Sequence, residues 1–272
     1  MKKSFLLIAA CVISVLASAQ IFEILSIEHL PAASFEDARV AGISPAGDYI
    51  LLTTGTTKGL QRYDLQTGKI TTLSRATNAG FDVKISKSGN EIAFTERTFH
   101  PGKEAITKTI SANLKNNTKS VLGKRVAVNT PIALRNEDGL MYIEQNGQRR
   151  LLAPFGTEDK IYIWTSLSPD NSKVCYYLSG YGCYVCNLDG SNNTFIGEDC
   201  RAAQWYNNNT LVAMHDTDDG HFITAASIVA YTLNGKVQVL TSPDMIAMYP
   251  YATQGKIAFS TIEGKTYLIT VK

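Results

Sequence analysis

The sequence predicts an all-β protein, a six-bladed β-propeller whose ring is closed when the N-terminal strand completes the last blade. Three observations lead to this fold. A turn followed by an apolar strand recurs along the chain, the repeats are of blade length, and the last repeat stops one strand early. No segment after residue 19 keeps the i, i+3, i+4, i+7 apolar spacing of a helix over three turns. We therefore expect almost no helix.

The recurring unit is a turn of the Ser-Pro-x-Gly type that leads directly into an apolar strand. It begins at Ile43, Ile85 and Leu167, and in a looser form at Trp205. The segments between these units are short, rich in Val, Ile, Tyr and Thr, and bounded by Gly, Asn and Asp turns. Strands of this kind at regular spacing are typical of a sandwich, a barrel or a propeller.

The first apolar residue after each turn sets the repeat length. The spacings between successive anchors are 42, 48, 34, 37 and 46 residues, and the anchors are Ile50, Ile92, Leu140, Val174, Leu211 and Ile257. A repeat of about 40 residues matches one four-stranded propeller blade, so six anchors predict six blades. The third blade divides into strands at 125–128, 131–135, 140–144 and 148–152, which puts Leu140 in its third strand.

The two ends of the mature chain are predicted to form the sixth blade together. After the strands at 257–260 and 266–271 the sixth repeat is one strand short, while the strand at 21–27 has no blade of its own. We expect residues 21–27 to form the outer strand of the sixth blade. Such closure protects strand edges that would otherwise promote aggregation.

The repeat resembles that of a known family. Ser-Pro-Asp/Ala-Gly-x-x-Ile, followed by Tyr-Asp-Leu-x-Thr-Gly-Lys-x-x-x-Leu, is similar to the WD40-like repeat of the TolB-type six-bladed propellers, best at 43–74 and 167–197 and less well at 85–123. The resemblance implies the fold and leaves activity open. The family includes periplasmic interaction proteins and the N-terminal propellers of prolyl-oligopeptidase-like peptidases. Neither a hydrolase domain after Lys272 nor the separate N-terminal domain of TolB is expected here.

Residues 1–19 have the pattern of a cleaved bacterial-type signal peptide. Lys2 and Lys3 precede an apolar run at 5–16, and the small residues 17–19 form a cleavage site. The alternatives are a retained anchor, for which the run is short of the roughly 20 residues of a spanning helix, and a lipoprotein signal ending at Cys11. We expect export to the periplasm or the extracellular space, and one propeller domain over residues 20–272.

The charge of the chain disfavours two classes of partner. Without Lys2 and Lys3 the formal net charge falls from +2 to 0, and no basic run follows. Nucleic acids and anionic lipids both require a basic patch. No later stretch is apolar enough to span a bilayer. We expect a monomer without a cofactor or a metal, and without a nucleic-acid partner or a membrane span.

Four cysteines of the mature chain lie in or beside the fourth repeat, at positions 175, 183, 186 and 200. If the turn between their strands is a two-residue loop, Cys175 faces Cys186, and a disulfide between them suits an exported protein; a loop of odd length removes this pairing. Four free thiols are an alternative. A zinc site is a further one, although only Cys183 and Cys186 have the close spacing of zinc ligands.

Motifs for catalysis are scarce. No Gly-x-Ser-x-Gly elbow and no glycine-rich phosphate loop occur. Residues 215–221 combine two histidines with three aspartates but fail the spacing of a calcium loop, and we interpret them as a solvated hairpin loop. In a propeller, the innermost strands line the central channel. The channel candidates for binding a ligand, by stacking and charge-assisted hydrogen bonds, are Arg39, Asp82, Tyr162, Trp164, Arg201 and Tyr249.

Two functions fit this sequence. The first is a non-catalytic exported propeller that binds a protein, peptide or glycan partner at the cell envelope. The second is a propeller hydrolase or lyase with an active site in the central channel. Carboxylates or histidines that converge at one channel mouth would favour the enzyme, and lone aromatic side chains would favour the binding protein.

Overall fold

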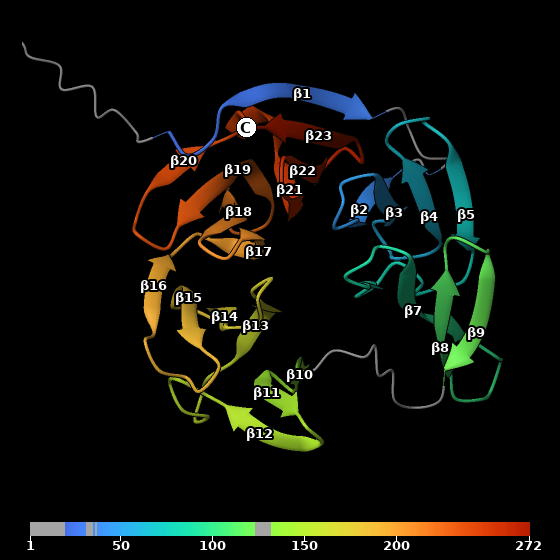
Figure 1. Ribbon diagram of the computed structural model, residues 1–272, viewed down its shortest axis with the longest axis horizontal. Helices are drawn as coiled ribbons and strands as arrows, with labels where there is room; N and C mark the ends of the chain where they lie inside the picture. The colour runs from blue at the N-terminus through green and yellow to red at the C-terminus, as the bar shows by residue number, and fades with distance from the viewer. Residues whose placement is uncertain (1–19, 31–34, 36, 123–131) are drawn as a thin grey trace, which may run out of the picture.

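The computed structural model describes residues 20–30, 35, 37–122 and 132–272, and six small antiparallel sheets are arranged as the blades of a ring (Figure 1). The predicted signal peptide lies outside the described residues. The six-bladed propeller is confirmed. Within the described segments the helical content is one 3-10 turn, η1 (Pro243–Met245), and none of their helices is long enough to cross a membrane.

The first three blades follow one another in chain order. Blade 1 consists of β2 (Ala38–Ile43), β3 (Tyr49–Thr54), β4 (Leu60–Asp64) and β5 (Ile70–Ser74). Blade 2 consists of β6 (Lys84–Ile85), β7 (Glu91–Thr98), β8 (Ile106–Asn113) and β9 (Thr118–Leu122). Blade 3 has three described strands, β10 (Ile132–Glu137), β11 (Leu140–Gln145) and β12 (Gln148–Leu152). These agree with three of its predicted strands, and the fourth, at 125–128, lies outside the described residues.

The other three blades complete the ring. Blade 4 consists of β13 (Tyr162–Leu167), β14 (Lys173–Leu178), β15 (Gly182–Asn187) and β16 (Thr194–Gly197). Blade 5 consists of β17 (Arg201–Asn207), β18 (Thr210–Asp218), β19 (Ile223–Thr232) and β20 (Val237–Val239). Blade 6 consists of β21 (Ala247–Thr253), β22 (Lys256–Thr261), β23 (Thr266–Val271) and β1 (Ile24–Leu30).

The repeated turn owes its sequence to a buried serine. The Ser44 hydroxyl accepts hydrogen bonds from the backbone N–H groups of Asp48 and Tyr49, at 2.9 and 3.1 Å. Ser168 does the same for Ser172 and Lys173, at 3.1 and 2.9 Å. The turn also requires a left-handed residue, which glycine supplies in blades 1 and 2. Asn171 has φ 59° at that position in blade 4, because asparagine also tolerates this conformation.

The N-terminal segment closes the ring as predicted, although its strand is Ile24–Leu30 and not 21–27. β1 pairs with β23, from Ile24 opposite Val271 to Leu30 opposite Thr266, and it is the outer strand of blade 6 (Figure 1). Just before β1, Gln238 of blade 5 binds the same segment. Its Oε1 accepts from the N–H groups of Ile21 and Phe22, both at 2.7 Å, and its Nε2 donates to the Phe22 carbonyl at 2.9 Å. The segment therefore joins blades 5 and 6.

The hydrophobic core is distributed between neighbouring blades. Between blades 5 and 6, for example, Val212 and Ile228 pack with Ile257, Phe259 and other buried side chains. A similar cluster between blades 4 and 5 contains Trp205, which is buried as the position of its repeat requires. This packing fixes the angle between blades and hence the positions of the innermost strands at the channel.

Candidate binding pocket in the central channel

The innermost strands share a backbone irregularity that shapes the channel. In four blades, one residue at the innermost strand has a left-handed backbone, three positions before Ile85, Leu167, Trp205 or Ala252. These residues are Asp82 (φ 51°), Trp164 (49°), Ala202 (50°) and Tyr249 (50°). In β13, β17 and β21 it coincides with a shift in strand register. A residue with a Cβ in this conformation is disfavoured by about 1–2 kcal/mol. Because even an alanine occurs here, the bulge belongs to the repeat, and the side chain at this position differs from blade to blade.

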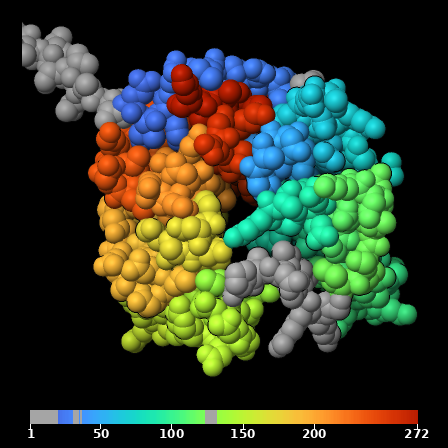
Figure 2. Space-filling view, viewed as in Figure 1, coloured from blue at the N-terminus to red at the C-terminus, as the bar shows by residue number. Residues whose placement is uncertain are grey.

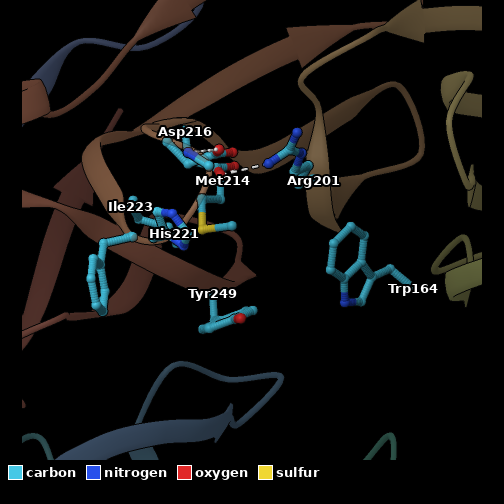
Figure 3. A pocket seen from close by; sticks show the side chains of 10 residues that line it. Trp164, Arg201, Met214, Asp216, His221, Ile223 and Tyr249 are labelled. Carbon is cyan, nitrogen blue, oxygen red and sulfur yellow. Dashed lines mark hydrogen bonds and ion pairs between the residues drawn. The ribbon is translucent and has the colours of Figure 1, made fainter.

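A pocket lies where the bulges of blades 4 and 6 face the start of β17. Its volume is about 400 Å³, and in the space-filling view the molecule is hollowed at its centre (Figure 2). Figure 3 shows the lining side chains converging from the three blades. They are Trp164, Arg201, Met214, Asp216, Asp218, His221, Phe222, Ile223 and Tyr249, together with the backbone of Gly220.

The centre of the pocket is an ion pair that is buried on one side. Arg201 opens β17 opposite Met214 of β18, and Asp216 follows Met214 by two residues on the same face. The Arg201 Nη1 donates to Asp216 Oδ2 at 2.6 Å, with side-chain exposures of 30% and 3% (Figure 3). Charge-assisted hydrogen bonds of this kind are roughly twice as strong as neutral ones. The pair therefore holds both side chains in one geometry.

The second carboxylate oxygen of Asp216 is buried and has no hydrogen-bond partner among the described residues. An unsatisfied buried acceptor costs about 1–3 kcal/mol. Arg201, in contrast, is well supported. Burial opposes its charge, but the hydrogen bond with Tyr177 and the carboxylate of Asp216 outweigh burial and raise the pKa of Arg201 above its ordinary value. The pocket thus presents a fixed cation and a carboxylate with unused acceptor capacity.

Aromatic rings flank this ion pair. Trp164 and Tyr249 are 38% and 43% exposed, although large aromatic side chains are usually more buried. Trp164 packs edge-on against Tyr177, with 5.3 Å between ring centroids, and Tyr177 is one of the groups that raise the pKa of Arg201. Trp164 is thereby held beside the ion pair while part of its ring stays accessible. Tyr249 lies below the ion pair in the view of Figure 3, with Trp164 to its right.

The structure separates the six channel candidates into two groups. Trp164, Arg201 and Tyr249 come together in the pocket. Arg39 instead joins blade 1 to blade 6, because it donates to the Thr261 carbonyl at 2.7 Å and pairs with Asp37 at 2.8 Å. Tyr162 is fully buried, and its hydroxyl donates to the Gly156 carbonyl at 2.9 Å. Asp82 is exposed and pairs with Lys84 at 2.5 Å.

The interpretation of residues 215–221 as a solvated loop is wrong in one respect. β18 continues to Asp218, so the turn begins later than expected, and Asp216 is a buried strand residue. His215 points to the other face, 47% exposed, with its Nε2 3.9 Å from Asp199. Side chains alternate between the two faces of a strand, so extending the predicted strand by two residues beyond Met214 would have placed Asp216 on the buried face. Sequence reasoning also missed Phe222 and Ile223, for which no motif gives a signal.

The pairing of Cys175 with Cys186 is not present. The turn between β14 and β15 contains three residues, so Cys175 faces Val185 and Cys186 faces Val174, on opposite sides of the sheet. All four cysteines are free and buried. Cys175 Sγ lies 3.6 Å from Cys183 Sγ, and these two pack with Cys200 between blades 4 and 5. Cys186 belongs to the core between blades 3 and 4, where burial raises its pKa to about 12.

Metal coordination finds no geometric support in the part of the chain that the structure describes. Nowhere in these residues do three or more His, Cys, Asp or Glu side chains gather closely enough to hold a metal ion. In the pocket, Asp216 is engaged by Arg201, and Asp218 Oδ1 accepts from the Gly220 N–H at 2.9 Å.

Comparison with known proteins supports the fold. No protein-family model matches this chain, and no curated protein matches it. Among solved structures, it is similar to a putative TolB from Agrobacterium tumefaciens, with a TM-score of 0.56 and 14% identity over 90% of this chain and 96% of that one. A chain of a mitotic checkpoint complex has a TM-score of 0.57 and 8% identity, covering 99% of both chains.

An oligogalacturonate lyase in complex with manganese has a TM-score of 0.49 and 15% identity, over 85% of this chain and 76% of that one. This last likeness carries no argument, and the two with TM-scores above 0.5 show the fold alone, without information about activity. The repeat of blades, the order of strands and the likeness to the Agrobacterium protein agree. The chain has a TolB-like, six-bladed propeller fold.

Proposed function

We propose that this protein is an exported, non-catalytic propeller that binds a protein, peptide or glycan partner at the cell envelope through the central pocket. The observation that carries the proposal is the meeting of Trp164, Arg201 and Tyr249, from three different blades, around the buried carboxylate of Asp216. Each of these three side chains lies on the innermost strand of its blade, β13, β17 or β21. Export rests on the signal-peptide pattern of residues 1–19.

The chemistry of the pocket suits recognition. Exposed aromatic rings offer faces on which a side chain or a sugar ring can stack, and the ion pair supplies directional hydrogen bonds. A volume of about 400 Å³ lies near the lower end of the range for ligand pockets. It accommodates one side chain or one sugar unit of a larger partner. The remaining contacts would then be made by the rim of the propeller.

A pull-down from the native envelope fraction tests this proposal. The baits are the wild-type protein and a Trp164→Ala/Tyr249→Ala variant, with Phe195→Ala as the matched control because Phe195 is an exposed aromatic on β16 outside the pocket. We expect the wild type and the control to recover the same partner and the double variant to lose it. Recovery of no partner, or equal recovery by all three baits, contradicts the proposal.

A second candidate is a hydrolase or lyase with its active site in the channel. It is favoured by one observation, the presence of Asp216, Asp218 and His221 around the same pocket. A carboxylate and an imidazole in one pocket are suited to general acid–base chemistry. Product release from peptide and polysaccharide substrates by the wild type, abolished in His221→Gln, would support this function over binding alone. Turnover that persists in His221→Gln would remove the case for it.

A further inference from the structure

We propose that the pocket receives a cationic side chain, an arginine or a lysine, of a peptide or protein partner. This inference rests on the proposed binding function and names its ligand class. Three properties of the pocket lead to it: its net charge, the free oxygen of Asp216, and the accessible aromatic faces. The first two properties share Asp216, the third comes from the aromatic side chains, and all three are features that a cation uses.

The charged residues that line the pocket are one arginine and two aspartates, a formal charge of −1. The charge of the arginine is already compensated, since Arg201 donates to the carboxylate of Asp216 at 2.6 Å. Asp218 has no cationic partner among the described residues, and its Oδ1 accepts only a backbone N–H, that of Gly220. An incoming cation therefore meets an uncompensated negative charge. The same negative charge would repel an incoming carboxylate or phosphate.

The free oxygen of Asp216 requires a donor. Asp216 is 5% exposed and lines the pocket, and its Oδ1 lacks any hydrogen-bond partner in the described chain. A guanidinium or an ammonium group carries several N–H donors and no acceptor, which matches a site whose unused capacity is that of an acceptor. Met214 lies beside Asp216 (Figure 3). Its unbranched side chain can change rotamer as a ligand approaches the carboxylate.

The aromatic side chains supply the third property. Trp164 and Tyr249, from blades 4 and 6, are each more than a third exposed in the pocket, and Phe222 on the β18–β19 turn is 73% exposed. A cation above an aromatic face is attracted by the negative potential of the ring, and tryptophan is the strongest partner. A neutral sugar would also stack on these rings, but it would leave the negative charge of the pocket unused.

The fluorescence of Trp164 can report binding directly. The chain has two tryptophans, and Trp205 is buried in the core at 7% exposure. In a Trp205→Phe background, Trp164 is the single indole, and it lies in the pocket. The probes are the tripeptides Gly-Arg-Gly, Gly-Lys-Gly, Gly-Gln-Gly and Gly-Glu-Gly, and the neutral disaccharide maltose. Calorimetric titration of the wild-type protein with the same probes provides the measurement should Trp205→Phe fail to fold.

We expect saturable binding of Gly-Arg-Gly or Gly-Lys-Gly, and binding of Gly-Gln-Gly and Gly-Glu-Gly that is weaker by about tenfold or more. Added salt should weaken the cationic probes because it screens the charges. Asp216→Asn/Asp218→Asn should reduce their affinity by about tenfold or more. Glu91→Gln, which removes an exposed carboxylate in blade 2, should leave it unchanged.

Several results would overturn the inference. They are equal binding of the arginine and glutamine probes, no binding of either cationic probe at roughly millimolar concentration, and an affinity unchanged in Asp216→Asn/Asp218→Asn. Binding of maltose in place of the cationic probes overturns the ligand class but leaves the binding function standing. The envelope pull-down separates the two proposals, because a partner lost with Trp164→Ala/Tyr249→Ala supports binding whatever the preferred probe.

Discussion

Removing Arg201 should destabilise the propeller far more than removing an arginine from its surface. Arg201→Met deletes the 2.6 Å hydrogen bond to Asp216 and leaves a carboxylate of 3% side-chain exposure with both oxygens unpaired. Breaking a buried ion pair by removing one partner costs about 3–5 kcal/mol. We expect a cost at the lower end of this range, because Arg201 is 30% exposed and the pair is only partly buried. A loss of about 3 kcal/mol corresponds to a factor of about 150 in the unfolding equilibrium constant.

Urea unfolding followed by intrinsic fluorescence measures this loss as a lower midpoint at an unchanged m-value. Arg149→Met is the matched control, because Arg149 and Glu137 form a surface pair at 2.7 Å with side-chain exposures of 41% and 53%; such a pair contributes about 0–1 kcal/mol. Arg201→Met/Asp216→Leu removes the stranded charge and should recover most of the stability. A cost for Arg201→Met no larger than that of the control would refute the reasoning.

The remaining predictions concern closure, acid stability and the thiols. Gln238→Leu removes three hydrogen bonds to the N-terminal segment and should cost about 2–3 kcal/mol in urea unfolding; no change would mean that β1 alone closes the ring. Hydrogen bonds from Ser168 and Ser172 lower the pKa of Asp170 to about 2. The ionised Asp170 therefore stabilises the fold above the unfolded pKa of about 4, and this stabilisation is lost as the pH falls toward 2. Asp170→Asn should make the unfolding free energy depend less on pH between about pH 4 and about pH 2. In the folded chain from Gln20 onward, a thiol reagent should label none of the four buried cysteines. In urea it should label all four, and labelling of only two cysteines in urea would reveal a disulfide.

The fold could be predicted from the sequence because its determinants are local. Ser44 and Ser168 hold their turns through hydrogen bonds to residues four and five positions away, so the repeated phrase marks each blade directly. The closing strand was predicted from a count of strands, and its pairing with β23 confirms that count. Gln238 also helps to close the ring, but its hydrogen bonds join positions more than 200 residues apart. No pattern in the neighbouring sequence predicts them.

The candidate pocket could be predicted in part, although its role as a binding site stays a prediction. Trp164, Arg201 and Tyr249 were predicted from their places on innermost strands, which the repeat defines. Asp216 was missed because the length of β18 depends on its pairing with β19, which continues past the usual end of a blade strand. The cysteine pairing failed for a similar reason, since one additional residue in a turn reverses the side of the sheet that each side chain faces.

The claim that the central pocket is the functional site is tested most directly by the amount of partner recovered from the native envelope. We expect the Trp164→Ala/Tyr249→Ala bait to recover less than about a tenth of the wild-type amount, while Phe195→Ala recovers as much as the wild type. Equal recovery by the wild type and the double variant would contradict the claim and would place the binding surface elsewhere on the propeller.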